Sequence, residues 1–183
     1  MKKLALLLTC VAFVSLFQSC DKLKKQIKAN VPIKSTDVTF TIPVVNNTNP
    51  NAAMGSFSTT VNVDSAIKAA NAQLGIGNIQ SAKIVSVHIE LIDNDTANNF
   101  ANFQSCAASF STDTKPTMVQ IASANIPNTP SSSLDLAVDN TIELKDYFSS
   151  TTYNYTLTGQ ARTPTTHELH AKATIQFTLE VSL

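Results

Sequence analysis

Apolar and polar residues alternate along most of the chain with a period of two, which is typical of strands that bury one face. The alternation predicts eight strands, over residues 38–44, 57–63, 81–92, 103–111, 118–123, 134–138, 153–161 and 169–183. The last is the clearest, because apolar residues hold every odd position from Leu169 to Leu183 and polar residues every even position between them. One face of this strand is therefore expected to be buried and the other wet. Its length favours a bend or bulge near Ala171–Ala173.

Two segments break the alternation. Asp64 is expected to cap a helix over residues 65–74 that ends at Gly75, and residues 142–148 suggest one or two helical turns. Strands joined by short turns, with so little helix, predict a mainly β fold. We expect an antiparallel β-sandwich, immunoglobulin-like in the loose sense, with one or two short helices over residues 35–183. A closed barrel is the alternative.

The first twenty residues have the layout of an export signal. Lys2 and Lys3 precede an apolar run that is too short to span a bilayer, and Phe17-Gln18-Ser19-Cys20 follows. A small residue directly before a cysteine resembles the lipobox of bacterial lipoproteins, in the relaxed form found in Bacteroidota. The resemblance implies that residues 1–19 are a signal peptide and that Cys20 becomes a lipidated N-terminus. A plain secretory signal and an N-terminal anchor helix are the alternatives.

Charge is distributed unevenly around this predicted lipidation site. Residues 1–34 contain seven lysines and one acid, Asp21, whereas the remainder contains six basic and twelve acidic residues. Residues 20–34 are therefore expected to form a basic tether, either as a short helix that ends at Pro32 or as a solvated, flexible spacer. Surface-exported lipoproteins of the resembled group often carry acidic residues after the cysteine, whereas lysines follow Asp21 here. We therefore expect lipid anchoring in the cell envelope, at the outer membrane facing the periplasm, with surface exposure left open.

Cysteine content agrees with this interpretation. Cys10 would leave with the signal and Cys20 would carry lipid, so Cys106 would be the remaining thiol. Between Phe103 and Phe110, Cys106 is expected to act as a small buried hydrophobe, with a reactive thiol as the alternative.

Four residues are candidate metal ligands: Asp93, Asp95, His167 and His170. His167 and His170 are three residues apart, whereas a zinc protease helix needs a spacing of four, and on a regular strand they would point to opposite faces. The loop that begins at Asp93 lacks the ligand spacing of an EF-hand, although an irregular calcium site stays open. Ordinary turn chemistry explains the same Asp and Asn residues, and no cofactor is expected.

Two triplets resemble the O-glycosylation signal of Bacteroidota. They are Asp64-Ser65-Ala66 and Asp95-Thr96-Ala97, which make Ser65 and Thr96 candidate glycan acceptors. Chance occurrence and helix capping by Asp64 are the alternatives.

The chain contains no recognisable catalytic motif. It has four glycines, no tryptophan and a single arginine, Arg162, so phosphate loops and aromatic sugar platforms are disfavoured. Zero net charge excludes the basic surface of a nucleic-acid binder. We therefore predict a non-enzymatic binding or structural module of the cell envelope, with the membrane as one partner and an unknown protein or glycan as another. The alternatives are a periplasmic carrier of a small apolar ligand and a metal-dependent hydrolase that uses His88, His167 and His170.

Overall fold

The computed structural model describes residues 27–35, 37–45, 49 and 51–183. Its strands are β1 (Lys28–Lys34), β2 (Val38–Ile42), β3 (Ala52–Thr60), β4 (Ile79–Leu91), β5 (Phe103–Thr112), β6 (Val119–Asn125), β7 (Ser133–Val138), β8 (Thr152–Ala161) and β9 (Leu169–Ser182). Its helical segments are α2 (Val63–Ala70) and the short 3-10 turns η1 (Ile76–Asn78), η2 (Phe100–Asn102) and η3 (Lys145–Ser149). Each of the eight strands predicted from the alternation is present.

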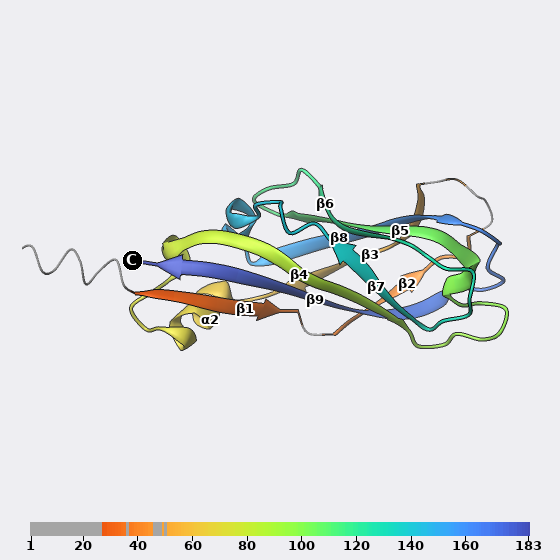
Figure 1. Cartoon of the computed structure of the whole chain (residues 1–183), viewed down its shortest axis with the longest axis horizontal. Coiled ribbons are helices and arrows are strands. Elements are labelled where there is room, and N and C mark those ends of the chain that lie inside the picture. The colour runs from red at the N-terminus through yellow and green to blue at the C-terminus, as the bar shows by residue number, and fades with distance from the viewer. Residues whose placement is uncertain (1–26, 36, 46–48, 50) are drawn as a thin grey trace, which may run out of the picture.

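The strands form two facing layers of antiparallel sheet. Sheet A contains β1 and β2, which both pair with β9, followed by β4 and β7, and sheet B contains β6, β5, β8 and β3. A short β6–β7 pairing at Ala122–Val138 and Ser123–Ala137 joins the two sheets. Figure 1 shows β4 and β9 side by side along the molecule, with sheet B folded over them. The predicted β-sandwich is thus confirmed. Among the described strands no ladder joins β2 to β3, so the sheet is not closed into a barrel.

Strand β9 carries out the alternation that its sequence predicts. Its odd-numbered side chains are buried and its even-numbered ones are partly or fully exposed. The expected irregularity lies in its partner instead: the register shifts fall in β4, between Ile79 and Ser81 and between Ile84 and Ser86. The extra residue of each bulge lets β4 follow the twist of β9 without a break in β9 itself.

Aromatic rings link the two sheets in the core. The Phe110 ring lies 5.4 Å from the Phe177 ring of the opposite sheet and 5.8 Å from the Tyr153 ring, measured between centroids. The turn η3 places the buried side chains of Tyr147 and Phe148 beside them, so it covers one end of the core. These contacts bury the largest apolar side chains of both layers together, which is the main source of stability in such a fold.

The helix differs in detail from its prediction. It spans Val63–Ala70 rather than residues 65–74, and its N-cap is Asn62, whose side chain accepts the Ser65 N–H at 2.9 Å. Asp64 lies in the first turn, where it forms an ion pair with Lys68 at 2.5 Å and accepts the Ile76 N–H at 3.0 Å. Asn and Asp are nearly equivalent as N-caps, so the sequence alone does not decide between Asn62 and Asp64. Val63 is buried, and the helix begins there, which makes Asn62 the cap.

The predicted tether is wrong in its described part. Residues 28–34 form β1, which pairs with β9 along its whole length, and they are not a helix ended by Pro32. Val31 and Ile33 are buried under the sandwich, while Pro32 faces outward on an edge strand, a position where its missing N–H costs nothing. The folded body therefore includes Lys28. Residues 20–26 of the tether lie outside the described residues.

Across the part of the chain that the structure describes, no helix is both long enough and apolar enough to cross a bilayer.

Candidate functional site

The two ends of the sandwich differ in what they present. Ile27 lies beside the last residues of β9, because its carbonyl accepts the Leu183 N–H at 3.3 Å. At the opposite end of β9, three loops meet: residues 92–102, 126–132 and 162–168. We call this the loop end; it also includes Val45, which follows β2. Figure 1 shows it at the side of the molecule away from the C-terminus.

Hydrogen bonds join the loops of this end into one surface. The Phe100 N–H donates to Ser131 at 2.9 Å, and the Leu91 N–H donates to Ser132 at 2.7 Å. Val45 and Thr165 exchange two hydrogen bonds, in which the Thr165 hydroxyl accepts the Val45 N–H at 3.0 Å. The loop end is therefore a braced surface whose side chains have defined positions.

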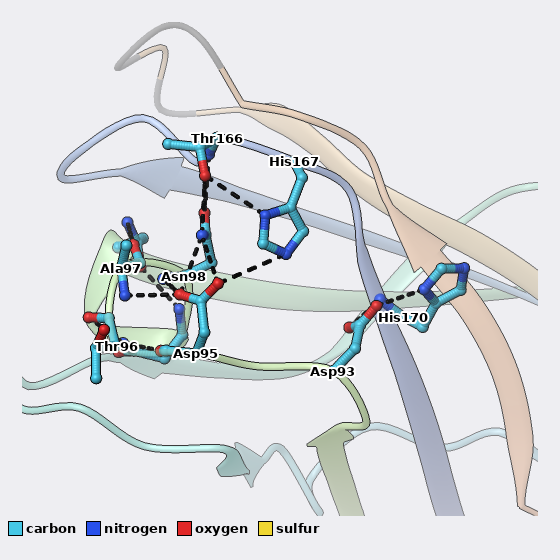
Figure 2. Close-up of polar contacts among 10 residues, drawn as sticks. Asp93, Asp95, Thr96, Ala97, Asn98, Thr166, His167 and His170 are labelled. Carbon is cyan, nitrogen blue, oxygen red and sulfur yellow. Dashed lines mark hydrogen bonds and ion pairs between the residues drawn. The ribbon is translucent and has the colours of Figure 1, made fainter.

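Asp95 organises the loop that follows β4. Its Oδ1 atom accepts the main-chain N–H groups of Ala97 and Asn98, both at 2.7 Å, and the Asn98 amide adds further contacts to both carboxylate oxygens. These hydrogen bonds hold the pKa of Asp95 below its ordinary value. Asn98 in turn bonds Thr166 of the neighbouring loop, as Figure 2 shows. Because its oxygens are occupied by N–H donors, Asp95 serves as the centre of a turn rather than as an open ligand.

The four candidate metal ligands form two separate pairs. His170 Nδ1 lies 2.6 Å from Asp93 Oδ2, whereas His167 Nε2 lies 4.0 Å from Asp95 Oδ2. Figure 2 shows the two pairs apart, with each histidine directed to its own aspartate. Among the described residues no three His, Cys, Asp or Glu side chains are close enough to share a metal ion.

His88, the third histidine of the hydrolase hypothesis, lies elsewhere. Its strand does neighbour that of His170, but the register places His88 opposite Thr174 and Leu91 opposite Ala171. The pair Glu90–Lys172, joined at 3.0 Å, lies between the two histidines, and His88 bonds Asp135 at 2.7 Å. The three histidines are thus engaged with three different aspartates on the surface.

The Asp93–His170 pair has a defined electrostatic effect. The hydrogen bond and charge of Asp93 raise the pKa of His170 above its ordinary value. Burial would raise the pKa of Asp93, but the bonds from the His170 ring and main chain outweigh it and the pKa of Asp93 falls. Both groups are therefore stabilised in their charged forms.

An open hollow of about 360 Å³ lies at the loop end. It is lined by polar side chains of two loops together with one proline: Asn94, Asp95, Thr96, Asn99, Pro130, Ser131 and Ser132. The side chains of Asp95, Asn99 and Ser131 already bond within these loops, so Asn94, Thr96 and Ser132 supply the polar groups that a partner could contact.

Arg162 is a structural residue that the sequence did not reveal. Its guanidinium donates to the carbonyls of Ala101 at 2.6 Å, Phe103 at 2.9 Å and Ile126 at 2.7 Å. It thereby joins residues 101–103 and Ile126 to the residue that follows β8, as a clamp beneath the loop end. Asn98, Asn99 and Asn102 are buried beside this clamp. Three asparagines within five residues are the sequence feature that indicates a hydrogen-bonded turn here.

The remaining candidate residues, for glycan attachment, thiol chemistry and lipidation, lie apart from one another. Ser65 on α2 and Thr96 at the loop end are both exposed. Cys106 is buried as predicted, and burial raises the pKa of its thiol to about 12. Tyr147 and Tyr153 pack in the core and donate their hydroxyls to Thr117 and Ser150 carbonyls. The lipidation candidate, Cys20, lies outside the described residues.

Comparisons with known proteins give similarity of shape only. No family model matches the sequence, and no curated protein matches it. A capsid structure of Helicobacter pylori bacteriophage KHP30 has 11% identity and a TM-score of 0.34, over 86% of this chain and all of the other. Infectious bursal disease virus strain Gx gives 8% and 0.42, over 84% of this chain and 33% of the viral one. The C-terminal domain of a Bacteroides fragilis chitobiase gives 12% and 0.32, over 54% and 58%. At these scores the matches contribute nothing to the assignment of function.

Proposed function

We propose that this chain is a lipid-anchored protein of the cell envelope, held in the outer membrane facing the periplasm, that works as a non-enzymatic binding or structural module. Lipidation at Cys20 rests on the signal-like segment and the Phe17-Gln18-Ser19-Cys20 sequence. The loop end is the surface that such a module would offer to a protein or glycan partner.

One observation supports this arrangement above others: the chain enters the sandwich at the end opposite to the loop end. Cys20 precedes Ile27 by seven residues, which span at most about 25 Å when fully extended. The anchor would therefore attach beside Ile27 and Leu183. Strand β9 has 14 residues and so separates the two ends by roughly 45 Å. An anchored molecule would present its hydrogen-bonded loops away from the membrane.

The two alternative functions gain no comparable support. The hollow between the sheets at Ile33, Phe148 and Phe177 has no volume for even a water molecule, so a carrier would have to open there. A hydrolase would need its histidines to converge, whereas they bond Asp135, Asp95 and Asp93 separately.

Metabolic labelling tests the anchor. Cells that express the chain are grown with labelled palmitate, and the Cys20→Ala variant is the matched control. We expect label on the native chain, none on the variant, and loss of Met1 from the mature protein. Label on the Cys20→Ala variant, or retention of Met1, would contradict lipidation at this position.

Protease treatment of intact cells tests the orientation. We expect the chain to be protected, together with a periplasmic marker, until the outer membrane is opened. Cleavage in intact cells while the marker survives would place the loop end outside the cell and would overturn the periplasmic assignment.

A further inference from the structure

Charge is absent from one layer of the sandwich. Strands β3, β5, β6 and β8, which make up sheet B, contain no Asp, Glu, Lys, Arg or His. Every strand of sheet A except β2 contains at least one such residue. Charged residues are only 14% of the chain, and among the described strands they are confined to sheet A, which leaves the strands of sheet B uncharged.

The outward side chains of sheet B form a regular array of hydrogen-bonding groups. The strand registers place Gln120, Ser109, Thr156 and Ser56 in one row across all four strands. All four are partly or fully exposed. Hydroxyls and amides both donate and accept hydrogen bonds, so the row offers both functions at every strand.

A second row lies two residues along β5 and β8 and three along β6, and it is only partly polar, because Ser123 of β6 and Thr158 of β8 lie on either side of Ala107. Near it the face is hollowed, with a volume of about 490 Å³ over β5, β6 and β8. Ser105, Gln120, Asn125 and Thr158 are among the side chains that line it. The array is thus combined with a concavity rather than spread over a convex surface.

We propose that the outer face of sheet B binds an uncharged polysaccharide that lies across the strands as an extended chain. Neighbouring strands are spaced at about 4.8 Å, which is close to the length of one sugar unit in such a chain. Each strand then meets one sugar with an amide or hydroxyl. An uncharged polyol complements this face because no ionised side chain has to be desolvated when it docks.

The same face indicates how binding would be distributed. The exposed large apolar side chains among the described residues include no aromatic ring, so stacking does not contribute. Recognition would come from many modest hydrogen bonds repeated along the array. A polymer is therefore the ligand, and a single disaccharide would bind far more weakly. This surface is separate from the loop end and does not depend on the lipid anchor.

Gel retardation tests the proposal with the purified full chain. The probe is hydroxyethylcellulose, an uncharged extended polymer, and carboxymethylcellulose is its anionic counterpart. We expect the uncharged polymer to retard the chain and the anionic polymer to retard it less. A gel that contains excess cellobiose instead of polymer should not retard it.

Substitutions place the binding surface. Thr156→Glu puts a charge into the centre of the array, and Thr178→Glu makes the same change on the outer face of sheet A, where Thr178 lies opposite Lys83. We expect the first to raise the dissociation constant at least tenfold and the second to leave it unchanged. Ser56→Glu, on the exposed edge strand β3, repeats the test at a site where folding tolerates charge.

Three results would overturn the proposal: no retardation of the native chain, equal loss in both threonine variants, or equal retardation by the two polymers. Lost palmitate labelling at Cys20 with retained retardation would contradict the anchor alone.

Discussion

His170 and Asp93 bond each other twice. The ring Nδ1 of His170 lies 2.6 Å from Asp93 Oδ2, and the main-chain N–H of His170 donates to Asp93 Oδ1 at 2.8 Å. This contact joins Asp93, just beyond the end of β4, to the second residue of β9, at the point where the loop end begins. One aspartate thereby fixes both the backbone and the ring of a residue 77 positions away.

Replacement of Asp93 by Asn should lower the pKa of His170 towards its ordinary value, because the charge that favours the imidazolium is lost. An NMR titration of the His170 ring measures this directly.

In the native chain the raised His170 pKa adds stability below about pH 6.5 that disappears as pH rises through the folded value. The lowered Asp93 pKa adds stability above about pH 4 that disappears on acidification. The difference in stability between native and D93N should therefore be greatest between these limits, and a constant difference from pH 4 to 9 would contradict the assignment.

Replacement of Arg162 by Ala should destabilise the fold by about 2–3 kcal/mol, because three carbonyls lose a charged donor. For a chain of this size the melting temperature should fall by roughly 5–10 °C, as followed by circular dichroism. Lys115→Ala provides the comparison, since its ion pair with Asp146 is exposed and worth less than about 1 kcal/mol. Equal effects of the two substitutions would argue against the clamp.

Replacement of Gly159 by Ala should cost about 1–3 kcal/mol. An added Cβ would overlap the Ser105 carbonyl oxygen and the Met54 sulfur at the centre of sheet B. Gly77→Ala is the matched control, because nothing lies within 4 Å of a Cβ at that position. Urea unfolding of the two variants should give a lowered midpoint for the first and a native midpoint for the second; a native midpoint for both would mean that β3 and β5 yield freely.

Cys106 should not react with a thiol reagent at pH 8 while the chain is folded. Its side chain is 1% exposed and burial raises its pKa to about 12, so almost no thiolate forms. A chain with Cys10→Ser and Cys20→Ser isolates this thiol. The expected result is modification only after denaturant is added, and rapid modification of the native chain would show that the sheet opens at β5.

The sequence was a good guide to the strands and a poor one to the first of them. Val31 and Ile33 hold alternate, buried positions in β1. The two lysines and the proline of this seven-residue segment, however, are typical of a tether, so the sequence did not indicate a strand. Its strand character depends on pairing with β9, which lies about 150 residues later in the chain. Local pattern alone therefore could not separate β1 from a spacer.

For the loop end, the sequence identified the residues but not their partners. Asp93, Asp95, His167 and His170 were all candidates, and each does engage another of the four. Only the β4–β9 register decides that they form two pairs and that His88 stays apart. The Arg162 clamp was invisible because its partners are main-chain carbonyls, which leave no trace in side-chain composition.

What the sequence determined by itself is the class of fold: alternation is a local property, and it fixes which side chains of each strand turn inward. What the tertiary structure decided is which strands are neighbours, at what register, and hence which loops share an end and which uncharged strands share a sheet. Those relationships depend on pairing between distant segments, where the buried surface of the whole sandwich selects one arrangement among many that the same alternation allows.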